Sequence, residues 1–175
     1  REGTWLSLGV SPDGTMIAFD MLGDLYTMPF AGGDASRITS GMAFDAQPRF
    51  SPDGKSIVFI SDREGADNVH VVDLATKAVK SITRGKANVY LSAEWSPDGK
   101  YLVFIKDGGG GLTGSLNTGT PGIYITPTAN WSPQKIVDGG EPQFTPDSKS
   151  LLYMSGGGLS KKVNRIGLHG QDKRE

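Results

Sequence analysis

The hydrophobic positions of this chain fall into short runs, each bounded by polar residues, glycine or proline. Four runs stand out, at residues 16–19, 57–60, 101–105 and 151–154. They are rich in β-branched and aromatic residues, a composition that favours strands. No segment has the helical period of apolar residues or a capping box. The pattern therefore predicts an all-β protein.

A tetrapeptide repeat precedes each of these runs. Ser11-Pro12-Asp13-Gly14 recurs at 51–54 and 96–99, and in weakened form as Thr145-Pro146-Asp147-Ser148. The prolines are about 40, 45 and 49 residues apart, close to the period of four-stranded propeller blades. An apolar residue stands before every copy: Val10, Phe50, Trp95 and Phe144. We therefore predict a β-propeller of four-stranded antiparallel blades, with about four blades in this chain.

The repeated tetrapeptide has the residues of a tight hairpin turn. Proline fixes φ near about −65°, aspartate bonds local backbone N–H groups, and glycine adopts the left-handed conformation. The aspartates belong to four separate turns, so they do not predict a metal site. Ser148 replaces the glycine in the fourth copy, which predicts a strained or re-shaped turn there. The residues to which we give a structural turn role are Pro12, Asp13, Gly14, Pro52, Asp53, Gly54, Pro97, Asp98, Gly99, Pro146 and Asp147.

The remaining apolar segments complete the blades. Glycine- and aspartate-rich turn signals separate third strands from fourth strands. Third strands are predicted at 25–28, 69–72, 123–125 and 163–166, and fourth strands at 36–39, 79–83 and 134–137. The chain is thus predicted to be one propeller segment, 1–175, with blades at about 4–39, 45–83, 90–137 and 141–175, the last lacking its outer strand.

Composition narrows the functions this segment can have. Hydrophobic residues make up 37% and charged residues 21% of the chain, with a net charge of −1, so a core is expected and a nucleic-acid partner is not. No apolar run approaches the ~18 residues that span a bilayer. The absence of cysteine excludes disulfides, thiol nucleophiles and cysteine-bound zinc. The 25 Gly and 10 Pro agree with many turns. From its two ends, we expect the sequence to be a piece of a longer chain.

Motifs for catalysis or cofactor binding are not found in the sequence. The two histidines, His70 and His169, cannot form the paired motifs of metallohydrolases. Gly109, Gly111 and Gly114 match a dinucleotide fingerprint, but the sequence that follows them cannot form the helix this fingerprint needs. The acidic run 61–68 does not have the spacing of a calcium loop and predicts a solvated hairpin. We therefore predict no catalytic residue, no metal and no cofactor within this segment.

Polar residues on the first strand of each blade are the better functional candidates, because that strand faces the central channel of a propeller. One column, two residues before each turn, contains Gly9, Arg49, Glu94 and Gln143; the next contains Ser7, Gln47, Ser92 and Glu141, with Asp45 beyond it. Two interpretations stay open. These residues join neighbouring blades through ion pairs and hydrogen bonds, or they line a polar channel that orients a ligand. The candidate channel-facing residues are Asp45, Gln47, Arg49, Glu94, Glu141 and Gln143.

The repeat resembles a known family. Its Ser-Pro-Asp-Gly turn, followed by an apolar strand and the Ser61-Asp62-Arg63 hairpin, resembles the TolB-type branch of β-propellers, and the Trp-Asp strand ending of the WD-type branch is missing. Segments 2–14, 22–29 and 45–54 are similar to the N-terminal propeller of bacterial amidohydrolase-family proteins. This similarity is specific as far as 95–99 and weakens from Gly108 onward.

The resemblance implies a periplasmic or secreted protein with a complete propeller of about six or seven blades, followed by a metal-dependent hydrolase barrel. None of that barrel's metal ligands is present, so the segment is expected to be a non-catalytic scaffold or substrate-access domain. Its expected partners are the remaining blades and the catalytic domain of the parent chain, or another copy of itself, and a peptide or protein ligand at the channel mouth. Two alternatives stay open: a TolB-like protein–protein interaction module of the bacterial cell envelope, and the gating propeller of a prolyl-oligopeptidase-type serine peptidase.

Overall fold

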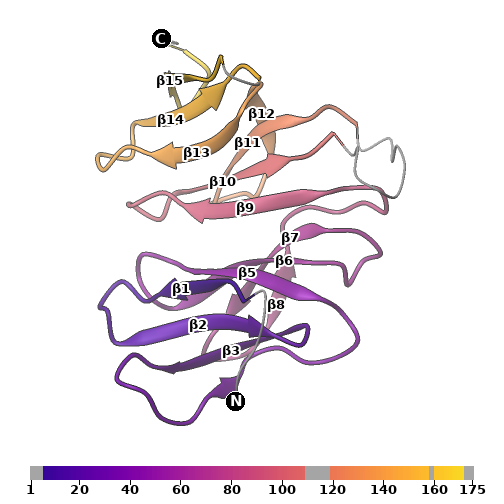
Figure 1. Cartoon of the computed structure of the whole chain (residues 1–175), viewed down its shortest axis with the longest axis vertical. Helices are drawn as coiled ribbons and strands as arrows, with labels where there is room; N and C mark the ends of the chain where they lie inside the picture. Colours follow the sequence, from indigo (N-terminus) through magenta and orange to yellow (C-terminus); the bar gives the residue numbers. More distant parts are fainter. Residues whose placement is uncertain (1–5, 109–118, 158–159, 172–175) are drawn as a thin grey trace.

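The computed structural model describes residues 6–108, 119–157 and 160–171, and their regular structure consists of strands. Four antiparallel sheets follow one another along the chain and stack along the long axis of the molecule, with the N-terminal sheet at the bottom and the C-terminal sheet at the top of Figure 1. The predicted all-β fold with propeller-like blades is confirmed. The described residues contain no helix long and apolar enough to cross a membrane.

Each sheet is one blade whose strands lie in chain order from the inner to the outer edge. Blade 1 contains β1 (Leu8–Val10), β2 (Met16–Met21), β3 (Asp24–Pro29) and β4 (Ser36–Arg37). Blade 2 contains β5 (Asp45–Phe50), β6 (Ser56–Ser61), β7 (Asn68–Asp73) and β8 (Val79–Ser81). Blade 3 contains β9 (Tyr90–Trp95), β10 (Tyr101–Lys106), β11 (Gly122–Pro127) and β12 (Gln134–Val137). Within the described residues, blade 4 contains β13 (Gly140–Phe144), β14 (Ser150–Ser155) and β15 (Lys162–Gly167).

The Ser-Pro-Asp-Gly turns join the first two strands of each blade by one repeated set of hydrogen bonds. In blade 1, Ser11 Oγ donates to Asp13 Oδ1 at 2.6 Å and accepts from Met16 N at 2.9 Å, while Thr15 N donates to Asp13 Oδ1 at 3.1 Å. The left-handed glycine has a φ of 70° or 71° in the first three copies. Ser148 takes the same place with a φ of 57°, so the fourth turn keeps its shape and carries the strain of a left-handed side chain.

The outer strand of blade 1 is shorter than predicted, and one hydrogen bond explains the difference. The sequence predicted a strand over 36–39, but β4 contains only Ser36 and Arg37. The Thr39 side chain accepts a hydrogen bond from Leu25 N at 2.9 Å, which turns the chain inward at this point. Thr83 Oγ1 accepts from Val69 N at 2.9 Å in the same way in blade 2. A threonine after the outer strand therefore fastens each of these two blades at its edge.

The hydrophobic core lies between blades. The second strand of each later blade points two apolar side chains toward the preceding blade: Ile57 and Phe59, Leu102 and Phe104, and Leu151 and Tyr153 are all at most 1% exposed. The corresponding residues of blade 1, Ile17 and Phe19, are only half-buried. On the opposite open face of the stack, Leu152 and Val163 of blade 4 are exposed. The described residues therefore form an arc with an unpartnered apolar face at each end.

Candidate functional site

The inner strands of blades 2, 3 and 4 share a bulge that strand alternation could not anticipate. Gln47, Ser92 and Glu141 have left-handed φ values of 57°, 54° and 53°. The strand register shifts there, between Ala46 and Arg49 in blade 2 and between Gly140 and Gln143 in blade 4. A bulge inserts one residue into the strand, so the period of two is interrupted. Counting residues back from the turn therefore does not predict which face of the strand a residue occupies once the count passes the bulge.

Gln47 links three blades. Its backbone N donates to Asp20 Oδ2 on β2 at 2.9 Å, and its Oε1 accepts from Ser92 N on β9 at 2.8 Å. Asp20 is buried and also accepts from Ser7 N at 2.9 Å. Asp20 was missed from the sequence, although an acidic residue directly after the apolar run 16–19 is a signal that could have found it.

Arg49 and Glu94 come from neighbouring inner strands and interact electrostatically. The Arg49 guanidinium reaches across to blade 1, where Nη1 donates to the Leu8 carbonyl at 2.8 Å. From blade 3, Trp95 Nε1 donates to the Arg49 carbonyl at 3.3 Å. Burial raises the pKa of the Glu94 carboxyl above its ordinary value, and the charge of Arg49 opposes this rise. The contacts of Arg49 thus connect blades; its role toward a ligand stays a prediction.

Asp45 lies within blade 2 and is only 1% exposed. Both of its carboxylate oxygens accept from Arg63 Nη2 at 2.7 Å. Arg63 is held in turn by Ser61 Oγ, which accepts from Nε at 2.9 Å, and its guanidinium lies 5.2 Å from the centre of the Phe59 ring. Sequence reasoning placed Arg63 in a solvated hairpin, whereas the structure makes it the partner of a buried carboxylate.

The two candidates in blade 4, Glu141 and Gln143, are exposed. Glu141 pairs with Lys161 from the β14–β15 connection, with 3.3 Å between Oε1 and Nζ. Both line an open cavity of about 370 Å³ with Met154 and Asp138. A paired surface carboxylate and ammonium in an open cavity can bind a polar group, but they do not form an acid–base or nucleophilic set.

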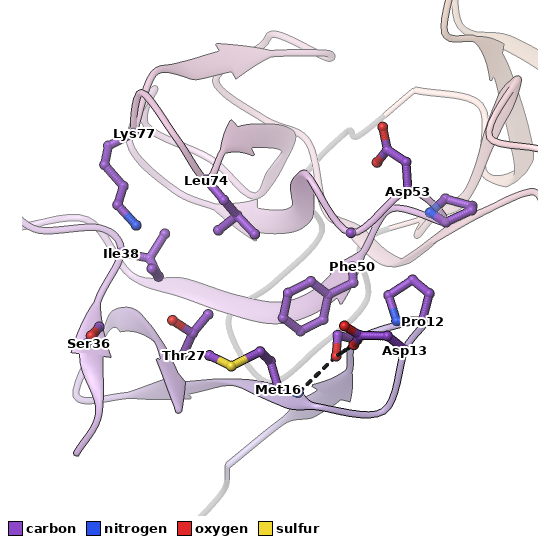
Figure 2. A pocket seen from close by; sticks show the side chains of 13 residues that line it. Pro12, Asp13, Met16, Thr27, Ser36, Ile38, Phe50, Asp53, Leu74 and Lys77 are labelled. Atoms are coloured by element: carbon purple, nitrogen blue, oxygen red, sulfur yellow. Dashed lines mark hydrogen bonds between the residues drawn. The ribbon is translucent and has the colours of Figure 1, made fainter. Parts of the chain in front are cut away.

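A larger cavity of about 540 Å³ opens between blades 1 and 2 at the edge that carries the Ser-Pro-Asp-Gly turns. Figure 2 shows Met16, Ile38, Phe50 and Leu74 projecting toward its middle, with Lys77 on one side and the turn aspartates on the other. A similar cavity of about 480 Å³ recurs between blades 2 and 3, lined by Pro52, Asp53, Trp95, Asp98 and Gly99. The recurrence shows that these grooves result from the way blades stack.

The turn aspartates at these grooves are charged and locally bonded. The hydrogen bond from the Ser11 hydroxyl, with those from Thr15, holds the pKa of Asp13 below its ordinary value. The pKa values of Asp53, Asp98 and Asp147 are lowered by the same arrangement of hydroxyl and backbone N–H donors. Each carboxylate therefore stabilises the turn to which it belongs. Within the described ranges, no group of three or more histidine or carboxylate side chains lies close enough to hold a metal ion.

His70 is a buried, neutral core residue. Its Nδ1 lies 3.0 Å from the Asn68 carbonyl, which can only accept, so Nδ1 carries the proton. Nε2 is buried without a hydrogen-bond partner, and burial lowers the pKa of the ring. The glycine-rich sequence with Gly109, Gly111 and Gly114 lies outside the described residues, as do residues 1–5 and 172–175.

The sequence of this chain matches a known family and curated relatives. The family model of the TolB beta propeller domain matches residues 2–175. The Tol-Pal system protein TolB of Francisella tularensis subsp. holarctica is 32% identical over 139 residues, which are 75% of this chain and 29% of that protein. The chain thus spans less than a third of the length of the curated relatives it matches.

Solved structures share the fold. TolB from Acinetobacter baumannii superposes with a TM-score of 0.75 at 23% identity, over 99% of this chain and 43% of that one. A puromycin-hydrolyzing peptidase of Mycobacterium tuberculosis superposes with a TM-score of 0.72 at 14% identity, over 99% of this chain and 29% of that one. At these identities the likeness establishes the blade architecture and leaves function to be argued separately.

Proposed function

The chain belongs to the TolB beta-propeller domain family, and on that premise we propose that it is a non-catalytic protein-interaction module of the bacterial cell envelope. The observation that carries the proposal is the 32% identity over 139 residues to a protein named for the Tol-Pal system. The site agrees with it, because the polar residues of the inner strands are used to join blades and the turn aspartates are bonded within their own turns.

The proposal includes completion of the propeller by blades outside this chain. The apolar side chains of Ile17 and Phe19 occupy the positions that are fully covered in the other blades, yet they are only half-buried. A sheet face of this kind needs a neighbour, because exposed apolar patches favour association. The remaining blades of the parent chain would cover the open faces of blades 1 and 4, and another copy of the chain is the alternative cover.

The proposed location is the periplasm, and the proposed partner is the Pal protein of the Tol-Pal system. The partner comes from the name of the Tol-Pal relative and the location from the family resemblance, and both are tested in cells. The full-length protein would be tagged, the cells fractionated, and complexes cross-linked before purification. We expect the protein in the periplasmic or envelope fraction, cross-linked to Pal. A cytoplasmic protein without this cross-link would overturn the assignment.

A second candidate is the propeller domain of an exported amidohydrolase-like hydrolase, for which it would filter substrate. The similarity of segments 2–14, 22–29 and 45–54 to such proteins favours it. The coding sequence after Glu175 discriminates between the candidates. A barrel with a His-x-His motif would support the hydrolase, and a Gly-x-Ser-x-Gly elbow would support a peptidase instead.

A further inference from the structure

The hairpin between β2 and β3 carries a leucine where the backbone disfavours one. Leu22 and Gly23 have φ values of 55° and 86°, so the turn is a two-residue hairpin with both central residues left-handed. Asparagine or glycine is the usual first residue of such a turn, because a larger side chain is strained there. Leu22 is also 95% exposed. The side chain is unfavourable for folding in both its backbone conformation and its exposure, which points to a role in binding.

Two further apolar side chains lie beside this turn, in the loop that leads into β5. Phe44 is 63% exposed and Met42 is fully exposed. Asp45 N donates to the Gly23 carbonyl at 2.9 Å, and a Cβ placed on Gly23 would lie 3.6 Å from Phe44 Cδ2. Leu22, Met42 and Phe44, here called the apolar patch, are therefore contributed by neighbouring segments of blades 1 and 2. The β2–β3 hairpin and the loop that leads into β5 lie at the edge opposite the Ser-Pro-Asp-Gly turns, on the right in Figure 1.

Carboxylates border the apolar patch on the side of blade 2. Asp62 Oδ1 accepts a hydrogen bond from Phe44 N at 2.7 Å. Burial raises the pKa of Asp67, and the nearby charge of Asp62 raises it further. Arg63, between them in sequence, is already paired with Asp45. Lys86 packs beside Gly65 on the side toward blade 3. The part of the rim next to Phe44 is therefore acidic.

We propose that the apolar patch is a docking surface for a segment of a partner protein that presents an apolar side chain next to lysine or arginine. The inference rests on the proposed interaction function and specifies where and by what chemistry a partner binds. The apolar side chain of the partner covers Leu22, Met42 and Phe44, and the basic one faces Asp62 and Asp67. Aromatic and apolar anchors inside a charged rim are the usual composition of such surfaces.

The test is selection of short random peptides displayed on phage against the full chain, followed by affinity measurements on synthetic copies of the enriched peptides. The key variant is Leu22→Asn, which removes the apolar side chain while placing a left-handed-tolerant residue in the turn, so it folds at least as well as the parent. Phe44→Ser is the second variant. Phe30→Ser is the matched control, because Phe30 is similarly exposed but follows β3 at the opposite edge.

We expect enriched peptides to combine leucine or an aromatic residue with lysine or arginine. Leu22→Asn should weaken their binding at least about tenfold with an unchanged or higher melting temperature, and Phe30→Ser should change it less than about twofold. If enriched peptides bind Leu22→Asn and Phe44→Ser as tightly as the parent, but lose binding on charge reversal of Arg49 or Glu94, the docking surface is wrong and the interaction function survives. If no peptide is enriched, the docking surface is wrong, and the cross-linking experiment in cells decides the interaction function separately.

Discussion

Gly9 in β1 lies against the first strand of blade 2, and a single added methyl group should push these strands apart. A Cβ on Gly9 would stand 2.7 Å from the Pro48 carbonyl oxygen and 3.5 Å from Arg49 Cα. Both are backbone atoms of a paired strand, which cannot rotate away. Overpacking of this kind costs about 1–3 kcal/mol, and the stiffer unfolded chain of an alanine variant offsets about 0.4–1 kcal/mol of that. Gly9→Ala is therefore expected to lose about 1–2 kcal/mol, or roughly 2–8 °C in melting temperature for a chain of this size.

Gly140→Ala is the matched control for this prediction. Gly140 also lies in an inner strand, its φ is outside the left-handed region, and a Cβ there would meet no atom within 4 Å. This variant should be neutral or up to about 1 kcal/mol more stable. Urea and thermal unfolding followed by circular dichroism would measure both. Equal stabilities of the two variants would refute direct contact between the inner strands of blades 1 and 2.

Three further predictions concern single interactions. Asp45→Asn should lower the free energy of unfolding in urea by about 2–3 kcal/mol, because it leaves the charge of Arg63 unpaired with only 25% of that side chain exposed. The double variant Asp45→Asn/Arg63→Leu should regain part of this loss. Equal stability of Asp45→Asn and the unsubstituted chain would contradict the role of the pair. His70→Phe should flatten the fall in melting temperature from pH 7 to pH 5. Burial holds the folded pKa of His70 below its ordinary 6.5, so the stability contribution of this residue is complete above that value and is lost as the pH drops below it. Ser148→Ala should lower the free energy of unfolding by about 1 kcal/mol, because it keeps the left-handed strain and removes the 3.1 Å hydrogen bond from Asp98 N. Ser148→Gly also removes this bond but relieves the strain, so its free energy of unfolding should stay within about 0.5 kcal/mol of that of the unsubstituted chain.

The fold could be predicted because the sequence patterns that determine it are local and repeated. Ser-Pro-Asp-Gly needs only its own atoms to form the turn. The continuous apolar run after it is the pattern of a strand that is buried on both faces. The outer strands of blades 1 and 2 were each predicted two residues too long, whereas β12 has its predicted range. β4 ends two residues early because Thr39 bonds Leu25 N, a contact between residues 14 apart in sequence.

The candidate site was harder to predict because its geometry depends on bulges and on contacts between blades. The left-handed φ values at the bulge belong to Gln47, Ser92 and Glu141. None of these is a glycine or asparagine, so the residue types did not predict the bulge. Asp45 was expected to face a channel, and the structure buries it against Arg63, 18 positions later. Leu22 was passed over because Gly23 and Asp24 already supplied a turn signal; a leucine before that glycine was the feature to notice.

The most direct test of the interaction function is a calorimetric titration of the purified, folded chain with the Pal protein of the same organism. We expect saturable one-to-one binding with a Kd below about 100 µM, and binding heats that weaken as salt screens the acidic rim. Gly140→Ala should bind like the unsubstituted chain, since the added methyl group would meet no atom within 4 Å. A chain that melts cooperatively, yet gives no saturable heat with Pal, would contradict the assignment.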